Sequence, residues 1–334
     1  MKNKYSFKFG VIVLSLVLIA CSGGSVDAGC PEIDGREINV VATTPMIGEF
    51  VRNVGGDNIN LTVLMPPEAD PHSYEPAPQD AGTIADADLV FYTGLMYEPS
   101  PLVELLENSV CGSEALAEVG ESVFPIEFKE GGHDDHDDHG EKGHDDHDDH
   151  GGHEGHGHGA YDPHFWFDPN RVVYASEFIE SKLIELDPSN AASYQAAGDT
   201  YATELSSLTG QVSQLIGSIP SQNRKLITTH ESLGYLEAKF GLEVLSTIIP
   251  DLDSSNEITP AQLVGVIDVI EDNNVKVIFI EAEAPSVYAE TIVAETGIKA
   301  VEGLWVETLK PGQTYPEFLI EAVELIVENL SNSD

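Results

Sequence analysis

The sequence predicts an α/β protein of two lobes joined by a long helical segment. Short apolar, β-branched runs alternate with helix-compatible stretches in both halves of the chain, a rhythm typical of parallel sheets covered by helices. A stretch over 191–216, rich in Ala, Leu, Gln and Glu, separates the two halves. The 334 residues suffice for about two domains, and the 41% of hydrophobic residues can supply two cores.

The first twenty residues are expected to be a lipoprotein signal peptide and not part of the fold. Lys2, Lys4 and Lys8 precede an apolar run, 11–20, that is shorter than the about 20 apolar residues a bilayer span requires. The run ends at Cys21 in a sequence that resembles the bacterial lipobox, whose cysteine becomes the lipidated first residue. We therefore expect an exported protein, lipid-anchored at the outer side of the cytoplasmic membrane or in the periplasm.

Strands and helices alternate through a predicted N-terminal lobe, 36–187, which follows a linker over 21–35. β-branched runs predict strands at 38–43, 59–65 and 89–93. A first helix is expected over 44–56, because Pro45 stands in its first turn and Gly55 and Gly56 at its end. Further helices are expected between the second and third strands, around 102–106 and over 170–185.

The segment 131–159 interrupts this alternation. It has no large apolar residue and contains an eleven-residue repeat, so no core can form from it and we expect a solvated loop. Its nine histidines and eight aspartates can chelate several ions weakly, although an inert solubilising insertion fits the same composition. The weak candidate ligands are His133, His136, His139, His144, His147, His150, His153, His156 and His158.

The alternation resumes after a linking helix, 188–218, in a predicted C-terminal lobe, 219–334. Strands are expected at 226–229, 242–246, 275–281 and 299–301. Helices are expected at 231–240, 260–272, 288–296 and 316–330.

Charge and cysteine content limit the partners of the protein. The 58 acidic and 15 basic residues give a net charge of −43, which would repel nucleic acid and anionic membranes and favours cations as ligands. If Cys21 carries lipid, Cys30 and Cys111 remain as one pair in an oxidising compartment and can form a disulfide. Their separation is unlike that of a zinc finger.

Three histidines lie outside the histidine-rich segment, and we expect them to share a metal site. His72 and His230 each follow a predicted strand, and ligands of open α/β sheets bind at the carboxyl ends of strands. His72 and His164 both stand in Asp-Pro-His turns. A single histidine is usually structural, but three imidazoles together suit zinc, copper, nickel or iron.

The motifs DPHSYEP, DPHFWFDP and THESLGY, with the lipobox and the Asp/His-rich segment, resemble the metal-binding solute-binding proteins of ABC importers, which include zinc and manganese receptors. The resemblance extends from residue 38 to 330. It implies two (β/α)₄ lobes joined by one rigid helix, with the ion in the cleft between them. The matching ligands are His72 and His164 from the first lobe and His230 and Glu307 from the second; the family usually has Asp at the position of Glu307.

The resemblance also bears on the choice of metal. Manganese receptors of this class carry Glu where this chain has His230, and three imidazoles favour zinc over the harder manganese ion. Family members with a His-rich insertion are generally zinc receptors. Carboxylates beside the ligands in sequence, which could orient the imidazoles, are Glu75, Asp168 and Glu231.

We expect a monomeric zinc receptor that works with an ABC permease and its ATPase, and no enzymatic activity. A manganese receptor and a lipoprotein metal buffer or adhesin are alternatives. A three-histidine zinc hydrolase is a weaker alternative, because Gly234 stands where an H-E-x-x-H motif beginning at His230 would need its second histidine.

Overall fold

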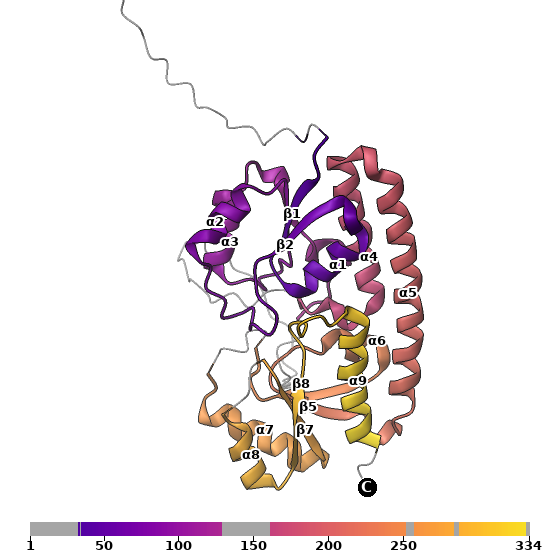
Figure 1. Cartoon of the computed structure of the whole chain (residues 1–334). Coiled ribbons are helices and arrows are strands. Elements are labelled where there is room, and N and C mark those ends of the chain that lie inside the picture. Colours follow the sequence, from indigo (N-terminus) through magenta and orange to yellow (C-terminus); the bar gives the residue numbers. More distant parts are fainter. Residues whose placement is uncertain (1–32, 34, 129–160, 252–256, 284–286, 332–334) are drawn as a thin grey trace, which may run out of the picture.

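The two-lobe α/β architecture is confirmed. The computed structural model describes residues 33, 35–128, 161–251, 257–283 and 287–331. They form two four-stranded parallel sheets, each flanked by helices, and a long helix that runs beside both (Figure 1). The signal peptide, Cys21, Cys30 and the histidine-rich segment lie outside the described residues. Within the described part of the chain, none of the helices is long and apolar enough to cross a membrane.

The N-terminal sheet has the strand order β2-β1-β3-β4, and its central strands are buried on both faces. Its strands are β1 (Ile38–Ala42), β2 (Ile59–Val63), β3 (Leu89–Tyr92) and β4 (Leu116–Glu118). Because successive side chains of a strand point to opposite faces, Val40 joins the large core while Val41 joins a smaller one. Helices α1 (Pro45–Gly55) and α4 (Pro169–Leu186) supply the large core, and α2 (Pro78–Ala85) and α3 (Ser100–Ser109) cover the other face.

Local sequence signals explain where α1 begins and ends. The Thr44 side chain accepts a hydrogen bond from the Ile47 backbone N–H at 3.1 Å, and Pro45 occupies the first helical position, where no N–H is needed. Gly56 ends the helix with φ +54°, a conformation that side-chain-bearing residues rarely adopt.

The C-terminal sheet repeats this plan with the order β6-β5-β7-β8. Its strands are β5 (Lys225–Thr228), β6 (Glu243–Thr247), β7 (Val277–Glu281) and β8 (Lys299–Leu304). Helices α7 (Pro260–Asn273) and α8 (Ala289–Thr296) form a separate core with one face. Helices α6 (Gly234–Phe240) and α9 (Tyr315–Ser331) join the large core, which therefore extends through both lobes.

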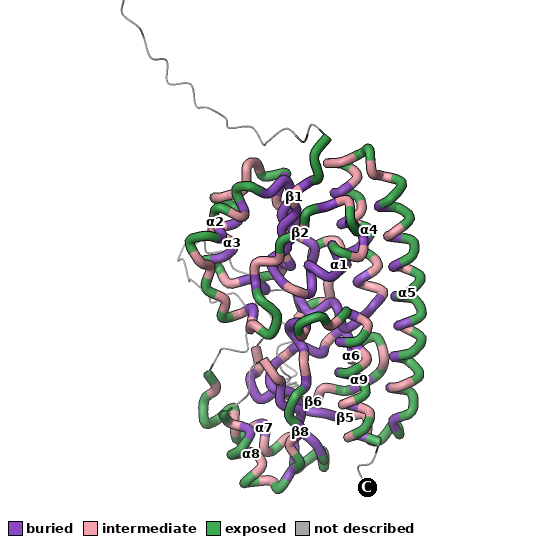
Figure 2. Tube along the Cα trace, viewed as in Figure 1, coloured by how far each residue is buried: buried purple, intermediate pink, exposed green. Residues whose placement is uncertain are grey.

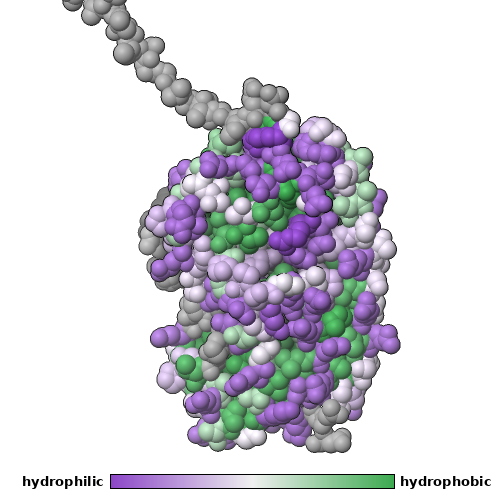
Figure 3. Space-filling view, in the orientation of Figure 1, coloured by the Kyte–Doolittle hydropathy of each residue, from purple (hydrophilic) through white to green (hydrophobic). Residues whose placement is uncertain are grey.

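Helix α5 (Ala191–Gly217) connects the lobes through one buried stripe. Its buried residues recur every three or four positions, the spacing of one helix face: Tyr194, Gly198, Tyr201, Leu205, Leu208, Val212 and Ile216. The stripe contacts α1 and α4 of the N-terminal lobe and α6 and α9 of the C-terminal lobe. Figure 2 shows the alternation of buried and exposed residues along α5, and Figure 3 shows hydrophilic residues over both lobes on the visible face.

The largest differences from the predicted elements lie at three places. Strand β4 was not predicted, because its three residues, Leu-Ala-Glu, carry no β-branched side chain and no apolar run. Helix α6 begins at Gly234, three residues later than predicted, since 231–233 form a turn after β5. Strand β8 continues to Leu304, beyond the predicted end at 301.

Candidate metal centre

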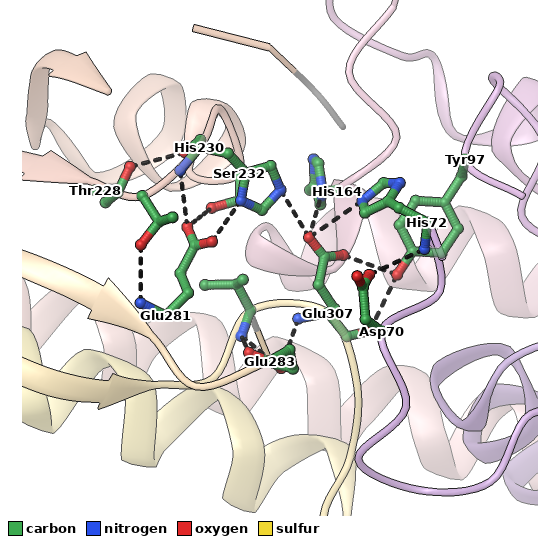
Figure 4. A network of polar contacts seen from close by, with 12 residues as sticks. Asp70, His72, Tyr97, His164, Thr228, His230, Ser232, Glu281, Glu283 and Glu307 are labelled. Atoms are coloured by element: carbon green, nitrogen blue, oxygen red, sulfur yellow. Dashed lines mark hydrogen bonds and ion pairs between the residues drawn. The ribbon is translucent and has the colours of Figure 1, made fainter. Parts of the chain in front are cut away.

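The four predicted ligands converge between the two sheets. His72 follows β2, His164 precedes α4, His230 follows β5 and Glu307 follows β8, so both lobes contribute a pair. One ligand atom from each lies within 4.8 Å of every other, and Figure 4 shows the three rings directed at the Glu307 carboxylate. We call these four residues the ligand cluster. His164, His230 and Glu307 are completely buried, and the His72 side chain is 5% exposed.

A single carboxylate oxygen stands at the centre of the cluster. Glu307 Oε1 lies 2.7 Å from His230 Nε2, 3.2 Å from His164 Nε2 and 3.4 Å from His72 Nε2. A tetrahedral zinc ion holds its ligand atoms about 3.4 Å apart, given metal–ligand distances near 2.1 Å. The three separations between Glu307 Oε1 and the histidine nitrogens are therefore of the scale that a bound ion requires.

The two Asp-Pro-His turns fold alike but support their histidines differently. Asp70 Oδ1 accepts the His72 backbone N–H at 3.0 Å, and Asp162 Oδ1 accepts that of His164 at 2.8 Å. Asp162 Oδ1 also lies 2.8 Å from His164 Nδ1. A proton held between those two atoms leaves Nε2 with the lone pair that a metal ligand needs.

His230 is oriented in the same way from the neighbouring strand of its own sheet. Glu281, the last residue of β7, places Oε2 2.5 Å from His230 Nδ1. Its other oxygen accepts the Ser232 hydroxyl at 3.1 Å, and the Glu281 backbone N–H donates to Thr229 Oγ1 at 3.0 Å. These contacts hold the imidazole with Nε2 toward the cluster.

Glu307 is held by one residue from each lobe. Tyr97, in the loop after β3, donates its hydroxyl to Glu307 Oε2 at 2.8 Å, so only Oε1 faces the histidines. Glu283 Oε1 accepts the backbone N–H groups of Val306, Glu307 and Thr308 at 3.0–3.3 Å. The backbone that carries Glu307 is thereby tied to the end of β7.

Burial and mutual charge set the protonation of the cluster. Burial lowers the pKa of His164, but the Glu307 charge and the hydrogen bond to Asp162 outweigh it and raise that pKa to about 9. Burial also opposes the charged form of His230, yet Glu281 and Glu307 raise its pKa well above the usual value. Burial would raise the pKa of Glu307, but the adjacent histidines hold it well below its usual range.

The residues fit a divalent ion by two further observations. Among the described residues, His72 Nε2 and His230 Nε2 are buried side-chain nitrogens that lack a hydrogen-bond partner of acceptable geometry. Buried polar atoms almost always have a hydrogen-bond partner. Two buried nitrogens that face the same carboxylate oxygen and lack one therefore indicate a missing partner. Three nitrogen donors and one oxygen donor form a set that zinc accepts.

The orienting groups proposed from sequence are wrong. Glu75 is exposed, the Asp168 side chain caps α4 by accepting the Asn170 N–H at 3.0 Å, and Glu231 accepts the Thr247 hydroxyl at 3.0 Å. Adjacency in sequence misled here because a side chain next to a ligand usually points away from it. The carboxylates that orient the imidazoles are Asp162, two residues before His164, and Glu281. The position of Glu281 at the end of a predicted strand was the sequence signal that could have identified it.

The remaining predicted site residues lie away from the cluster or outside the described residues. Cys111 is disulfide-bonded, and Cys30, its expected partner, falls outside them. Cys21 and the nine histidines of 131–159 also fall outside.

Comparison with known proteins assigns the family. The profile of the family described as "Zinc-uptake complex component A periplasmic" matches residues 40–329. The manganese-binding lipoprotein MntA of Halalkalibacterium halodurans is 25% identical over 98% of this chain and 99% of its own length. The manganese ABC transporter substrate-binding lipoprotein PsaA of Streptococcus anginosus is 28% identical over 96% of this chain and 97% of its own.

Solved structures agree on the fold. The periplasmic zinc-binding protein TroA of Treponema pallidum superimposes with a TM-score of 0.74 at 22% identity, covering 89% of this chain and all of TroA. A crystal structure of ZnuA gives a TM-score of 0.69 at 24% identity over 88% of this chain. The family match covers most of the chain and both sets of relatives span it. The chain therefore belongs to the zinc-uptake component A family of metal-binding solute-binding proteins of ABC importers.

Proposed function

We propose that the protein is an extracytoplasmic zinc receptor that delivers Zn²⁺ to the permease of an ABC importer, which works with its own ATPase. The observation that carries the proposal is the convergence of three imidazole nitrogens on one carboxylate oxygen between the lobes. The ion would be the transported cargo, held by His72, His164, His230 and Glu307.

The donor set favours zinc over manganese. The Tyr97 hydroxyl is hydrogen-bonded to Glu307 Oε2, so the cluster offers three nitrogens and one oxygen to a metal. This donor set suits a tetrahedral zinc ion. Manganese prefers carboxylate, carbonyl and water oxygens. Manganese remains the second candidate, because the relatives MntA and PsaA are named for that metal. A hydrolytic zinc site would need an open coordination position, whereas in the proposed site Glu307 would fill the fourth position.

Direct competition between the two metals tests the proposal. The mature protein, purified without added metal, is titrated with zinc in the presence of a large excess of manganese. We expect one equivalent of zinc to bind with high affinity despite the manganese. Retention of manganese against equimolar zinc would make the protein a manganese receptor, and binding of neither would remove the receptor assignment.

Replacing Glu307 tests the fourth ligand. We expect Glu307→Ala to weaken zinc binding roughly tenfold, about 1.4 kcal/mol, because water can take the vacated oxygen position. The alanine variants of His72, His164 and His230 should lose clearly more. The measurement is competition with a zinc chelator of known affinity. Wild-type affinity in Glu307→Ala, with failure of the histidine variants, would mean that the site uses three histidines and water.

Deleting 131–159 separates tight from weak binding. We expect the whole mature protein to bind one zinc ion tightly and several weakly, and the deletion to remove only the weak class. Calorimetric titration of both proteins under identical conditions resolves the two classes. Loss of the tight site in the deleted protein would show that the segment contributes ligands to it.

Lipid attachment depends on one residue. Cys21→Ala should move the protein from the membrane fraction to the soluble fraction, because the lipidated cysteine is the proposed anchor. Fractionation of cells expressing each form, followed by immunoblotting, gives the distribution. An unchanged membrane association would refute lipidation at Cys21.

A further inference from the structure

The contact between Asp162 and helix α6 links a ligand of one lobe to the backbone of the other. Asp162 orients His164, a ligand from the N-terminal lobe, through the 2.8 Å contact with Nδ1. Helix α6 belongs to the C-terminal lobe and begins at Gly234, four residues after His230. It packs against the 3₁₀ turn Phe165–Phe167 that follows His164.

Gly234 lies so close to Asp162 that any side chain would collide with it. A Cβ atom built on Gly234 would stand 2.5 Å from Asp162 Oδ2, where ordinary contact begins near 3.4 Å. The φ angle of Gly234 is not in the left-handed region, so its backbone conformation does not require glycine. Space for the carboxylate is therefore what distinguishes glycine from alanine at this position.

The Asp162 carboxylate cannot retreat without releasing His164. Its residue is 3% exposed, and its backbone is held on both sides: the N–H donates to Ile126 O at 3.0 Å, and the carbonyl accepts the Tyr235 hydroxyl at 2.8 Å. With its backbone held, Asp162 can yield at Oδ2 only by rotating its side chain. Because the two oxygens belong to one rigid group, that rotation also displaces Oδ1 from His164 Nδ1.

We propose that Gly234 is a positioning residue for zinc binding: its missing side chain lets the C-terminal lobe receive the Asp162 carboxylate that orients His164. The segment from His230 to Gly234 thus has two roles at the site. His230 supplies a ligand, and Gly234 leaves room for the carboxylate that orients His164 of the other lobe. The inference rests on the proposed zinc-binding function.

The test is a double-mutant cycle on the full mature chain, with zinc affinity measured by chelator competition. Losing a group that orients a ligand usually costs ten- to hundredfold in metal affinity, and we expect Gly234→Ala and Asp162→Ala each to lose that much. The double variant should bind no more weakly than Asp162→Ala alone, since the added methyl group then meets no carboxylate. Gly210→Ala in α5, where nothing lies within 4 Å of the added Cβ, is the matched control and should bind like wild type.

The outcomes separate this inference from the function on which it rests. Wild-type affinity in Gly234→Ala, or a double variant whose losses add, would overturn the positioning role. If His230→Ala also binds zinc with wild-type affinity, the proposed ligand cluster itself is overturned. Thermal unfolding of the metal-free proteins accompanies the cycle, because alanine in a helix normally stabilises relative to glycine. A Gly234→Ala protein that unfolds earlier than wild type, with a double variant that unfolds no earlier than Asp162→Ala, supports the same collision with Asp162.

Discussion

His230→Ala is expected to lower zinc affinity by more than a hundredfold. The substitution removes one of three imidazoles and leaves Glu281 facing a cavity in place of the Nδ1 atom that it contacts at 2.5 Å. Removing a group that merely orients a ligand usually costs ten- to hundredfold. Removing the ligand itself, which also leaves Glu281 Oε2 without its imidazole partner, should cost more. The affinity is obtained by competition with a chromogenic zinc chelator.

A second histidine supplies the control for this experiment. His150→Ala makes the same chemical change within the segment 131–159, to which we assign only weak binding, and should leave the tight site unchanged. Equal losses in the two variants would mean that the segment also contributes to the tight site. If neither variant loses affinity, the ligand cluster does not bind the ion.

Zinc affinity is also expected to fall steeply with pH, by at least a hundredfold between pH 8 and pH 6. A bound imidazole must be neutral, and in the metal-free protein the pKa of His164 is raised to about 9. Zinc therefore competes with a proton throughout this range, and one protonated histidine costs up to tenfold for each pH unit. The raised pKa of His230 adds to the loss. Histidines with the usual pKa near 6.5 would give nearly constant affinity above pH 7.5.

The stability of the metal-free protein should change in the opposite direction. A raised pKa in the folded state contributes stability that is fully present below the unfolded pKa, near 6.5, and is lost as pH rises through about 9. Thermal unfolding with and without zinc, from pH 6 to 9, measures both trends. The protein lacking 131–159 is used so that nine other histidines do not titrate. Zinc affinity that stays flat from pH 8 to 6 would contradict coordination by these imidazoles.

The sequence predicted the architecture where the signals were local. The alternation of β-branched runs and capped helices predicted both sheets, and His230 at the end of a strand marked the edge where ligands meet. Strand β4 was missed because its three residues acquire their strand conformation only by pairing with β3. Glu307 could be singled out only through the resemblance, since one acid among 58 acidic residues carries no local signal.

The groups that support the ligands were beyond local reasoning. Tyr97 and Glu307 are 210 residues apart, and Glu281 and His230 are 51 apart. The Glu281–His230 contact exists because parallel strands bring the loops at their carboxyl ends together, which depends on strand order and not on sequence distance. Tyr97 and Glu307 follow strands of different sheets, so their contact depends on how the two lobes face each other. Asp162 was the exception. Its Asp-Pro-His sequence could have been recognised as an Asx turn, in which the aspartate side chain accepts the backbone N–H of His164 and also lies beside the His164 ring.

The single helix α5 has a mechanical consequence for release of the cargo. It is about 40 Å long at 1.5 Å per residue, contains no proline and is anchored by its buried stripe on both lobes. A wide rotation of one lobe relative to the other would have to bend α5, which would break backbone hydrogen bonds of the helix, or it would have to break the contacts of α5 with one of the lobes. We therefore expect the residence time of the ion to depend on rearrangement of the ligand-bearing loops after β2, β5 and β8, and the two sheets to keep nearly the same mutual orientation throughout.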